Sequence, residues 1–360
     1  MKILVIYASA GAGHQKAAEA IYEGIKKYTS HEARLVDVLD YTNSKNLYKK
    51  SYFLMISKAP WLWAFFFGLI DIPWLQPLVR FVRRVYNSII AVKLEKFLKA
   101  EQFDYILSTH FMPNEVASSL KAKGLIKSKV ISCVTDFDVH KIWLGKAVDK
   151  YTVACEWTKE KLKSIGIDEK KIFVTGIPTN EKFAAKVDVS ELKKKLGVRP
   201  DAFTALIATG SFGIGPIEEI IKALNGEMQV VVVCGHNKGL YQTLSEQKYG
   251  DVVVFSLVDN MYELMSVADV MVTKPGGLSI SEALVKQLPM IFFSPIPGQE
   301  TNNIMVLKRY GIGFEGSGIE EIVSELKSLM NSRDKFLTAL KMTTNLSYPS
   351  AVKDIVSLIV

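Results

Sequence analysis

Short runs of consecutive apolar residues recur along the whole chain, and most are followed by a polar or glycine-containing turn. Strands buried on both faces of a parallel sheet show this pattern, whereas strands with one solvated face alternate apolar and polar residues. The runs predict strands over residues 2–9, 34–39, 104–108, 129–134, 149–154, 171–175, 205–208, 230–234, 252–257, 267–272 and 290–293. Apolar positions at helical spacing predict helices that include residues 15–28, 156–165, 279–288 and 350–358. The alternation of the two patterns predicts an α/β protein with parallel sheets.

A turn at Gly176-Ile177-Pro178 follows the sixth predicted strand and marks a crossover between two halves of the chain. A chain of 360 residues is long for one hydrophobic core, so two domains are expected. We predict an N-terminal domain over residues 1–176 and a C-terminal domain over residues 177–345.

Cysteine usage and the N-terminal sequence favour a reducing compartment. The three cysteines, Cys133, Cys155 and Cys234, are far apart and form no C-x-x-C pair, which argues against a disulfide framework or a zinc site. The sequence from Met1 to Ile6 is a predicted strand that leads into a glycine loop, and it lacks the longer apolar core and the cleavage site of a signal peptide. We therefore expect a cytosolic location.

The positive charge of the chain is concentrated in one aromatic segment. The formal net charge is +8, and residues 41–100 alone contain ten Lys or Arg against two acids. A charge confined to one segment indicates one anionic surface as the partner. Within this segment, residues 61–70 form an unbroken apolar decapeptide, which is too short to cross a bilayer.

Aromatic residues flanked by cations suit the headgroup layer of an anionic membrane, so we predict a monotopic docking region. A buried helical hairpin is the alternative. Nucleic acid is not expected as a partner, since stacking sites spread aromatics among polar residues. The predicted docking residues are Trp61, Trp63, Phe65, Phe66, Arg80, Arg83 and Arg84.

Polar residues and glycines follow several of the predicted strands, where open α/β sheets bind ligands. The richest stretch is residues 273–303, in which Gly276 and Gly277 allow close approach of a ligand and the next helix offers free N–H groups to a phosphate. Ser279 and Glu282 also have the spacing of a capping box, which needs no ligand, and the two interpretations have about equal weight. The later Gly298-Gln299-Glu300 favours a ligand site, because capping does not explain it.

Two other glycine loops lie between a predicted strand and a helix. Gly11-Ala12-Gly13-His14 is weak evidence for a dinucleotide, since Lys16 stands where the third glycine of that fingerprint would be. The loop at residues 209–215 offers a second set of backbone amides for a diphosphate.

The ordered sequence KPGGLSISEAL…LPMIF…PIPGQETNN resembles the donor-site signature of the inverting glycosyltransferases that include the monogalactosyldiacylglycerol synthases and the processive diacylglycerol glucosyltransferases. The T-D-x-x-x-H-x-x-W pattern at residues 135–143 is similar to one on the acceptor side of those enzymes. A more distant resemblance is to the peptidoglycan N-acetylglucosaminyltransferase. The resemblance extends from Gly11 to Asn303.

This resemblance implies a GT-B fold, with two Rossmann-like domains facing each other across a cleft and a C-terminal helix, about residues 346–360, that crosses back to the first domain. It implies an inverting hexosyltransferase that moves glucose or galactose from UDP-glucose or UDP-galactose to diacylglycerol, at the cytoplasmic face of the membrane. The product would be a β-monoglycosyldiacylglycerol. The alternatives are N-acetylglucosamine transfer to a lipid-linked peptidoglycan precursor, and a non-catalytic lipid- or nucleotide-binding protein.

No metal or other cofactor is expected. Asp136-Phe137-Asp138 has the D-x-D spacing of a metal motif, but the surrounding motifs resemble a metal-independent class. Backbone amides would then neutralise the leaving diphosphate. We expect His14 to be the general base, because the dipole at a helix N-terminus disfavours the imidazolium. Asp136 is the second candidate.

The resemblance also implies roles for the remaining site residues. His140 would line the acceptor side, the backbone around Val258 would contact the uracil ring, Glu282 would bind the ribose hydroxyls, and Gln299 and Glu300 would bind the sugar. The full set of expected donor-binding residues is Gly13, Gly210, Ser211, Gly213, Val258, Lys274, Gly276, Gly277, Ser279, Glu282, Gln299 and Glu300.

Overall fold

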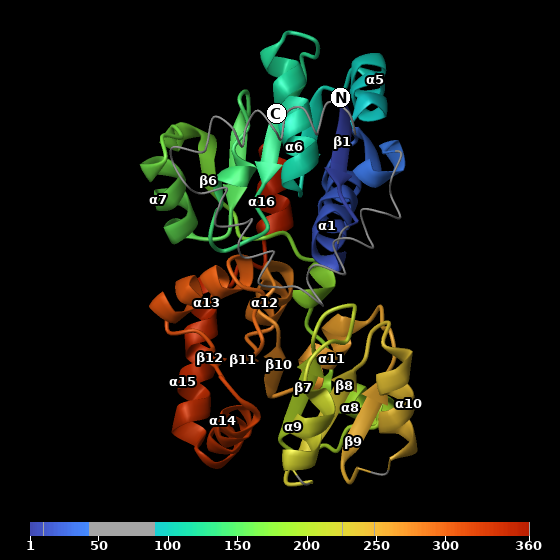
Figure 1. Ribbon diagram of the computed structural model, residues 1–360, viewed down its shortest axis with the longest axis vertical. Coiled ribbons are helices and arrows are strands. Elements are labelled where there is room, and N and C mark those ends of the chain that lie inside the picture. The colour runs from blue at the N-terminus through green and yellow to red at the C-terminus, as the bar shows by residue number, and fades with distance from the viewer. Residues whose placement is uncertain (10, 43–90, 225, 248, 360) are drawn as a thin grey trace. The chain divides into compact units, whose positions relative to one another are not determined.

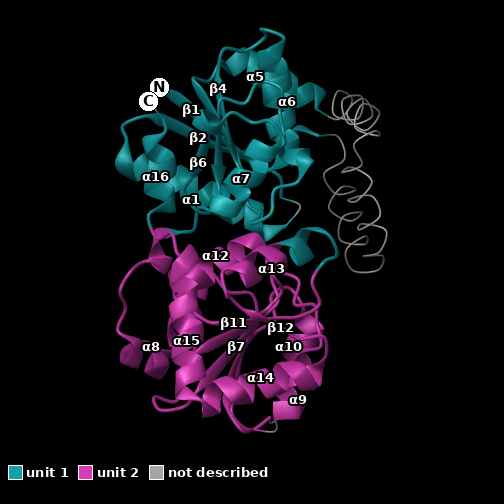
Figure 2. Ribbon diagram, turned by 90° about the vertical axis from the view of Figure 1, so that its left-hand side faces the viewer, with its two compact units in different colours: residues 1–180, 296–302, 350–360 teal, residues 181–295, 303–349 magenta. Residues whose placement is uncertain are grey.

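The computed structural model describes residues 1–9, 11–42, 91–224, 226–247 and 249–359 (Figure 1). The chain forms two compact units. Unit 1 contains residues 1–180, 296–302 and 350–360, and unit 2 contains residues 181–295 and 303–349 (Figure 2). The predicted membrane-docking residues, Trp61 to Arg84, lie outside the described residues, so that prediction stays a prediction.

Unit 1 is built on a six-stranded parallel sheet with the order β2-β1-β3-β4-β5-β6. Its elements are β1 (Lys2–Tyr7), α1 (Ala12–Tyr28), β2 (Glu32–Asp37), η1 (Val38–Tyr41), α5 (Val92–Glu101), β3 (Tyr105–Ser108), α6 (Phe111–Ala122), β4 (Lys129–Cys133), η3 (Lys141–Trp143), β5 (Lys150–Val153), α7 (Glu156–Ser164), η4 (Glu169–Lys171), β6 (Ile172–Val174) and α16 (Ala351–Ser357).

Unit 2 has a second six-stranded parallel sheet, with the order β12-β11-β10-β7-β8-β9. Its elements are η5 (Glu181–Phe183), α8 (Val189–Leu196), β7 (Thr204–Ala208), α9 (Ile217–Leu224), β8 (Gln229–Val233), α10 (Lys238–Glu246), β9 (Val252–Phe255), α11 (Met261–Val267), β10 (Val270–Thr273), α12 (Gly277–Val285), β11 (Met290–Phe292), β12 (Phe314–Glu315), α14 (Ile319–Asn331), α15 (Arg333–Thr343) and η6 (Thr344–Leu346). Helix α13 (Gln299–Arg309) begins in unit 1 and continues in unit 2. The predicted α/β class with two Rossmann-like parallel sheets is confirmed.

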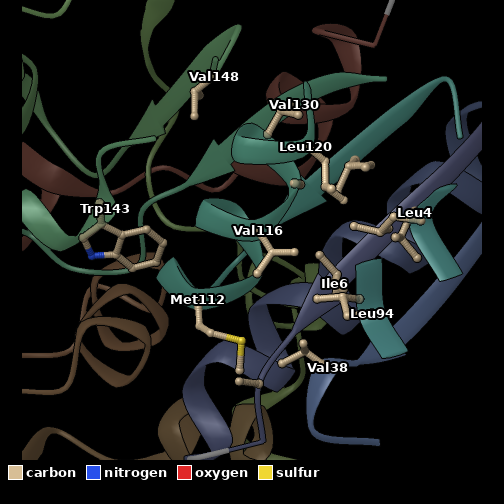
Figure 3. Close-up of a cluster of buried hydrophobic side chains, with 14 of the residues drawn as sticks. Leu4, Ile6, Val38, Leu94, Met112, Val116, Leu120, Val130, Trp143 and Val148 are labelled. Carbon is tan, nitrogen blue, oxygen red and sulfur yellow. The ribbon is translucent and has the colours of Figure 1, made fainter. Parts of the chain in front are cut away.

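The first sheet is buried on both faces, which explains why its strands are continuous apolar runs. In β1, Leu4 and Ile6 belong to a core cluster with residues of α5 and α6 (Figure 3). Ile3 and Val5 belong to a second cluster with residues of α1 and α16. Since successive side chains of a strand point to opposite faces, the two clusters cover the two sides of the sheet.

Helix α16, drawn in red in Figure 1, packs on α1 within unit 1. The contact requires a small residue on α1, because a Cβ atom at Gly24 would clash with Val352 of α16. Lys150 of β5 also donates a hydrogen bond to the Leu358 carbonyl, at 2.9 Å. The C-terminal end of the chain is thus part of the first unit. In the described ranges, no helix is long and apolar enough to cross a membrane.

Each sheet has one switch point, a pair of neighbouring strands whose following connections lead to opposite sides of the sheet order. In unit 1 it lies between β1 and β3, and in unit 2 between β7 and β10. Open α/β sheets bind their ligands outside the carboxyl ends of such strand pairs. The candidate site is therefore sought in the loops that follow these four strands.

Candidate functional site

His14 lies in the first turn of α1, directly after β1, and is joined to the loop after β3 by two hydrogen bonds. Its Nδ1 lies 2.7 Å from the Thr109 carbonyl oxygen. The Thr109 hydroxyl in turn donates to the His14 carbonyl oxygen, at 2.8 Å. The topology of the first sheet thus places the predicted base at its switch point.

The Thr109 contact determines which nitrogen of His14 carries the proton. A carbonyl oxygen only accepts hydrogen bonds, so Nδ1 must be the donor. In the neutral ring, Nε2 then has the free lone pair and is the nitrogen that can accept a proton. Thr135 Oγ1 lies 3.0 Å from the same Nδ1.

Burial keeps the His14 ring neutral. The ring of His110 lies edge-on to that of His14, with 4.7 Å between centroids, and the Trp143 ring lies at 6.3 Å. Burial lowers the pKa of His14 from 6.5 to about 4, although the bond to Thr109 acts in the opposite direction. The helix dipole was the cause expected from the sequence, whereas in the structure the cause that lowers the pKa of His14 is burial.

His110 is a second neutral imidazole beside His14. It precedes α6, where its Nδ1 accepts a hydrogen bond from the Met112 amide at 3.2 Å. Burial, followed by the proximity of His14, holds the pKa of His110 well below its usual range. No role was expected for His110, although its position directly after a strand was a usable signal.

Asp136 follows β4 and is paired with Gln299. The Gln299 side-chain amide donates to Asp136 Oδ1 at 2.8 Å. Gln299 belongs to the segment 296–302 of unit 1, so the structure brings these two predicted site residues together. Glu300, next in the chain, accepts from the Ile296 amide at 2.6 Å and thereby fixes the turn before α13.

Asp138 is engaged by a lysine on a neighbouring helix. Its carboxylate side chain is 1% exposed and lies 2.6 Å from Nζ of Lys161, on α7. Asn302 donates a further hydrogen bond at 3.0 Å. Neither partner was expected from the sequence. No group of three or more His, Cys, Asp or Glu residues that could hold a metal ion is present in the part of the chain that the structure describes.

His140 has a structural contact at the start of the short helix η3. Its Nδ1 accepts a hydrogen bond from the Ile142 amide at 3.1 Å, and the residue is buried. This contact fixes the loop between Asp136 and Trp143. The role of His140 on the acceptor side stays a prediction.

In unit 2, the loop at residues 209–215 follows β7 and is fastened to the loop after β8. The His236 amide donates to the Ser211 carbonyl oxygen at 2.8 Å. The Asn237 side chain donates to the Gly213 carbonyl oxygen at 2.9 Å. Gly213 has φ +57°, and a Cβ atom there would clash with the Cys234 carbonyl oxygen. Only glycine fits this position, so the shape of the loop is fixed by its surroundings.

The loop after β10 lies at the other side of the same switch point. The Thr273 hydroxyl donates to the Ala208 carbonyl oxygen at 2.7 Å, which joins the ends of β10 and β7. The buried Asn303 donates to the Pro275 carbonyl oxygen at 3.0 Å. The predicted diphosphate-binding loops thus follow two neighbouring strands. Asn303 belongs to the motif over residues 273–303, but no role was expected for it.

Helix α12 begins two residues before its predicted start. Gly276 is its N-cap residue and Gly277 its first helical residue. Ser279 is therefore inside the first turn and cannot be the N-cap of a capping box with Glu282, so that alternative is wrong. The first backbone N–H groups of a helix have no acceptor within the helix. In α12 these N–H groups begin at Gly277.

Ser279 and Glu282 share one side of α12. Both are half-buried, whereas the neighbouring residues of the helix are buried, namely Leu278, Ile280, Ser281, Ala283 and Leu284. Residues three apart in a helix are neighbours on its surface, so these two side chains lie on the accessible side. Lys274 before the helix and Val258 after β9 are half-buried as well.

Comparisons with known proteins identify both halves of the chain. Residues 14–179 match the family model for monogalactosyldiacylglycerol (MGDG) synthase, and residues 205–354 match the glycosyltransferase family 28 C-terminal domain. A processive diacylglycerol beta-glucosyltransferase of Bacillus cereus is 30% identical over 99% of this chain and 93% of its own length. A protein of the same name from Bacillus anthracis is 29% identical over the same shares.

Solved structures of low sequence identity share the fold. Acinetobacter baumannii MurG has a TM-score of 0.62 at 13% identity, covering 100% of this chain and 99% of that chain. HepE from Anabaena in complex with UDP has a TM-score of 0.60 at 15% identity, with the same coverage. The UDP-GlcNAc 2-epimerase from Neisseria meningitidis has a TM-score of 0.64 at 13% identity. Because epimerases share this fold, the fold alone does not distinguish glycosyl transfer from epimerisation.

Proposed function

Since this chain belongs to the family of the processive diacylglycerol β-glucosyltransferases and monogalactosyldiacylglycerol synthases, we propose that it is an inverting GT-B hexosyltransferase that moves glucose from UDP-glucose to diacylglycerol. Glucose is proposed over galactose because the relatives that match along nearly the whole chain are named glucosyltransferases. The product is a β-glucosyldiacylglycerol, to which further sugars can be added.

The observation that carries the proposal is the fixed, neutral His14. Its Nδ1 proton is donated to Thr109, so Nε2 takes the proton of the lipid hydroxyl as the acceptor oxygen bonds to the anomeric carbon. The bond between that carbon and the diphosphate oxygen breaks on the opposite face, and UDP leaves with the bonding electrons. Attack opposite to the leaving group converts an α-linked donor into a β-linked product.

Asp136 then has a role other than that of the base. Its Oδ1 accepts from the Gln299 amide nitrogen, which leaves Gln299 Oε1 as an acceptor for a sugar hydroxyl. We assign Asp136 as a positioning residue for Gln299. Glu300 would bind the sugar beside it, and Gly13 would face both substrates.

The donor is assigned to the loops after β7 and β10. Backbone amides of Gly213, Gly276 and Gly277 neutralise the leaving diphosphate, with contributions from Gly210 and Ser211. The Ser279 hydroxyl and the Lys274 ammonium add a donor each. Glu282 accepts from the ribose hydroxyls, and the backbone at Val258 contacts the uracil.

The reaction is proposed to need no metal or other cofactor. Lys161 already balances the charge of Asp138, which supports a structural role for the second carboxylate of Asp-Phe-Asp. The backbone amides of the glycine loops supply the electrostatic stabilisation that a cation provides in other glycosyltransferases.

The protein is proposed to bind peripherally to the cytoplasmic face of an anionic membrane, where diacylglycerol is present. The support is the positive charge of residues 41–100, with the aromatic residues among them. His140 is assigned to the acceptor side.

The experiment that tests this function supplies labelled UDP-glucose, UDP-galactose and UDP-N-acetylglucosamine separately. The liposomes contain either diacylglycerol or a lipid-linked peptidoglycan precursor, in neutral or anionic lipid. We expect labelled lipid from UDP-glucose, and more of it on anionic liposomes at low salt. Transfer only from UDP-N-acetylglucosamine to a lipid-linked peptidoglycan precursor would favour the alternative enzyme. No transfer from any donor would contradict the proposal.

A further inference from the structure

Three neighbouring strands of the first sheet each contribute one group to the surroundings of His14 Nδ1. His14 follows β1, Thr109 follows β3 and Thr135 follows β4, and these strands are adjacent in the order β1-β3-β4. In a parallel sheet their carboxyl ends lie at the same edge. Residues 95 and 121 positions away in the sequence thereby meet at one imidazole nitrogen.

The two oxygens at Nδ1 have different capacities. The Thr109 carbonyl at 2.7 Å can only accept, so it fixes the proton on Nδ1. The Thr135 hydroxyl at 3.0 Å then faces an N–H group and must accept as well. One N–H shared between two acceptors restricts the rotation of the ring about its Cβ–Cγ bond, which would exchange Nδ1 with Cδ2 and take the N–H group away from the Thr109 carbonyl.

From this arrangement we propose that Thr135 is a positioning residue for His14, whose hydroxyl, together with the Thr109 carbonyl, holds the ring in the tautomer that leaves Nε2 as the proton acceptor. The inference rests on the proposed function for its catalytic consequence. In many histidine bases a carboxylate lies at this nitrogen and stabilises the imidazolium. Two uncharged oxygens orient the ring without adding a negative charge beside it.

A structural role for Thr135 makes different predictions. Thr135 is buried, so in a purely structural role its β-branched side chain would contribute through its shape and packing alone. Valine keeps that shape and removes the hydroxyl, whereas serine keeps the hydroxyl and removes a methyl group. The two substitutions therefore separate packing from hydrogen bonding.

The tautomer can be measured directly in the full-length protein. The chain has five histidines, so ¹⁵N-histidine labelling gives a small set of ring signals, and the His14→Gln variant identifies those of His14. We expect the unsubstituted protein and Thr135→Ser to show protonated Nδ1. In Thr135→Val the ring is free to rotate away from the Thr109 carbonyl, so it should show a mixture of tautomers, with kcat about fivefold lower, as for the loss of one hydrogen bond. The KM for UDP-glucose should be unchanged.

Thr175→Val is the matched control, because it removes another buried hydroxyl of unit 1, one that donates to the Gly176 carbonyl oxygen. It should change neither the tautomer nor kcat. An unchanged His14 tautomer in Thr135→Val would overturn the proposal, as would a loss of kcat in Thr135→Ser as large as in Thr135→Val. If His14→Gln retained full activity, the base assignment in the proposed function would fail, while the tautomer measurement would still decide the positioning claim.

Discussion

The side-chain amide of Gln299 donates a hydrogen bond to Asp136 Oδ1 at 2.8 Å, and the two residues are 163 positions apart in the sequence. Asp136 follows β4, whereas Gln299 begins α13. This hydrogen bond occupies one carboxylate oxygen of Asp136, the residue expected from the sequence as the second candidate for the base. It supports His14 as the base and links Asp136 to the binding of the sugar.

Gln299→Glu should destabilise unit 1 because it places a second carboxylate against Asp136. Like charges raise the pKa of such a pair in the folded state, so stability is lost as the pH rises from the ordinary carboxyl pKa of the unfolded chain through that raised pKa. We expect a larger decrease in melting temperature at pH 8 than at pH 5. Gln242→Glu, at an exposed glutamine within α10, is the control and should show no such difference. Equal decreases for Gln299→Glu at the two pH values would show that the two side chains are not in contact.

Lys161→Ala should destabilise the protein by roughly 2–3 kcal/mol, because it leaves the buried carboxylate of Asp138 without its cation. Asn302 still donates to that carboxylate, so the loss is smaller than for a fully unpaired charge. The control is Lys163→Ala on the same helix, which breaks ion pairs with the more exposed Glu160 and Glu169 and should cost much less, because solvent screens these pairs. Chemical unfolding measures both. Similar losses would mean that Asp138 is not buried as described.

Glu282→Ala should weaken UDP binding by roughly 1–3 kcal/mol, because the ribose hydroxyls lose their acceptor. Since α12 begins at Gly277, the substitution removes no helix cap. Calorimetry with UDP measures the affinity, and a melting curve without UDP provides the control. Unchanged UDP affinity would remove Glu282 from the donor site.

Activity should persist in excess EDTA, because backbone amides of the glycine loops stabilise the leaving UDP in the proposed mechanism. The measurement is transfer to diacylglycerol liposomes before and after chelation. Complete loss that Mn²⁺ restores would favour a metal site at Asp136 and Asp138.

The sequence was a reliable guide where burial on both faces dictates the residue types. The run from Ile3 to Ile6 is apolar because alternate residues enter two different cores, and the strand is found where the run predicts it. Its carboxyl end was predicted too far along, at Ser9. The structure ends β1 at Tyr7, and Ser9 instead bonds to Asp37.

The site was less accessible to the sequence because its pairings are long-range. Asp138 meets Asn302 from 164 positions away, and no local spacing predicts that contact. The start of α12 was missed because glycine is a poor helix former, whereas Gly277 is buried and helical in the folded unit. Local propensity was overridden there by tertiary packing.

The pH dependence of kcat/KM tests the central claim, a neutral His14 that accepts the proton of the lipid hydroxyl. Burial lowers the pKa of His14 to about 4, and the base must be unprotonated, so activity is lost only as the pH falls through that value. With UDP-glucose and diacylglycerol liposomes, we expect kcat/KM to be level from pH 8 to pH 5, with His14→Ala inactive throughout. An acid limb centred near pH 6.5, or an active His14→Ala variant, would contradict the account.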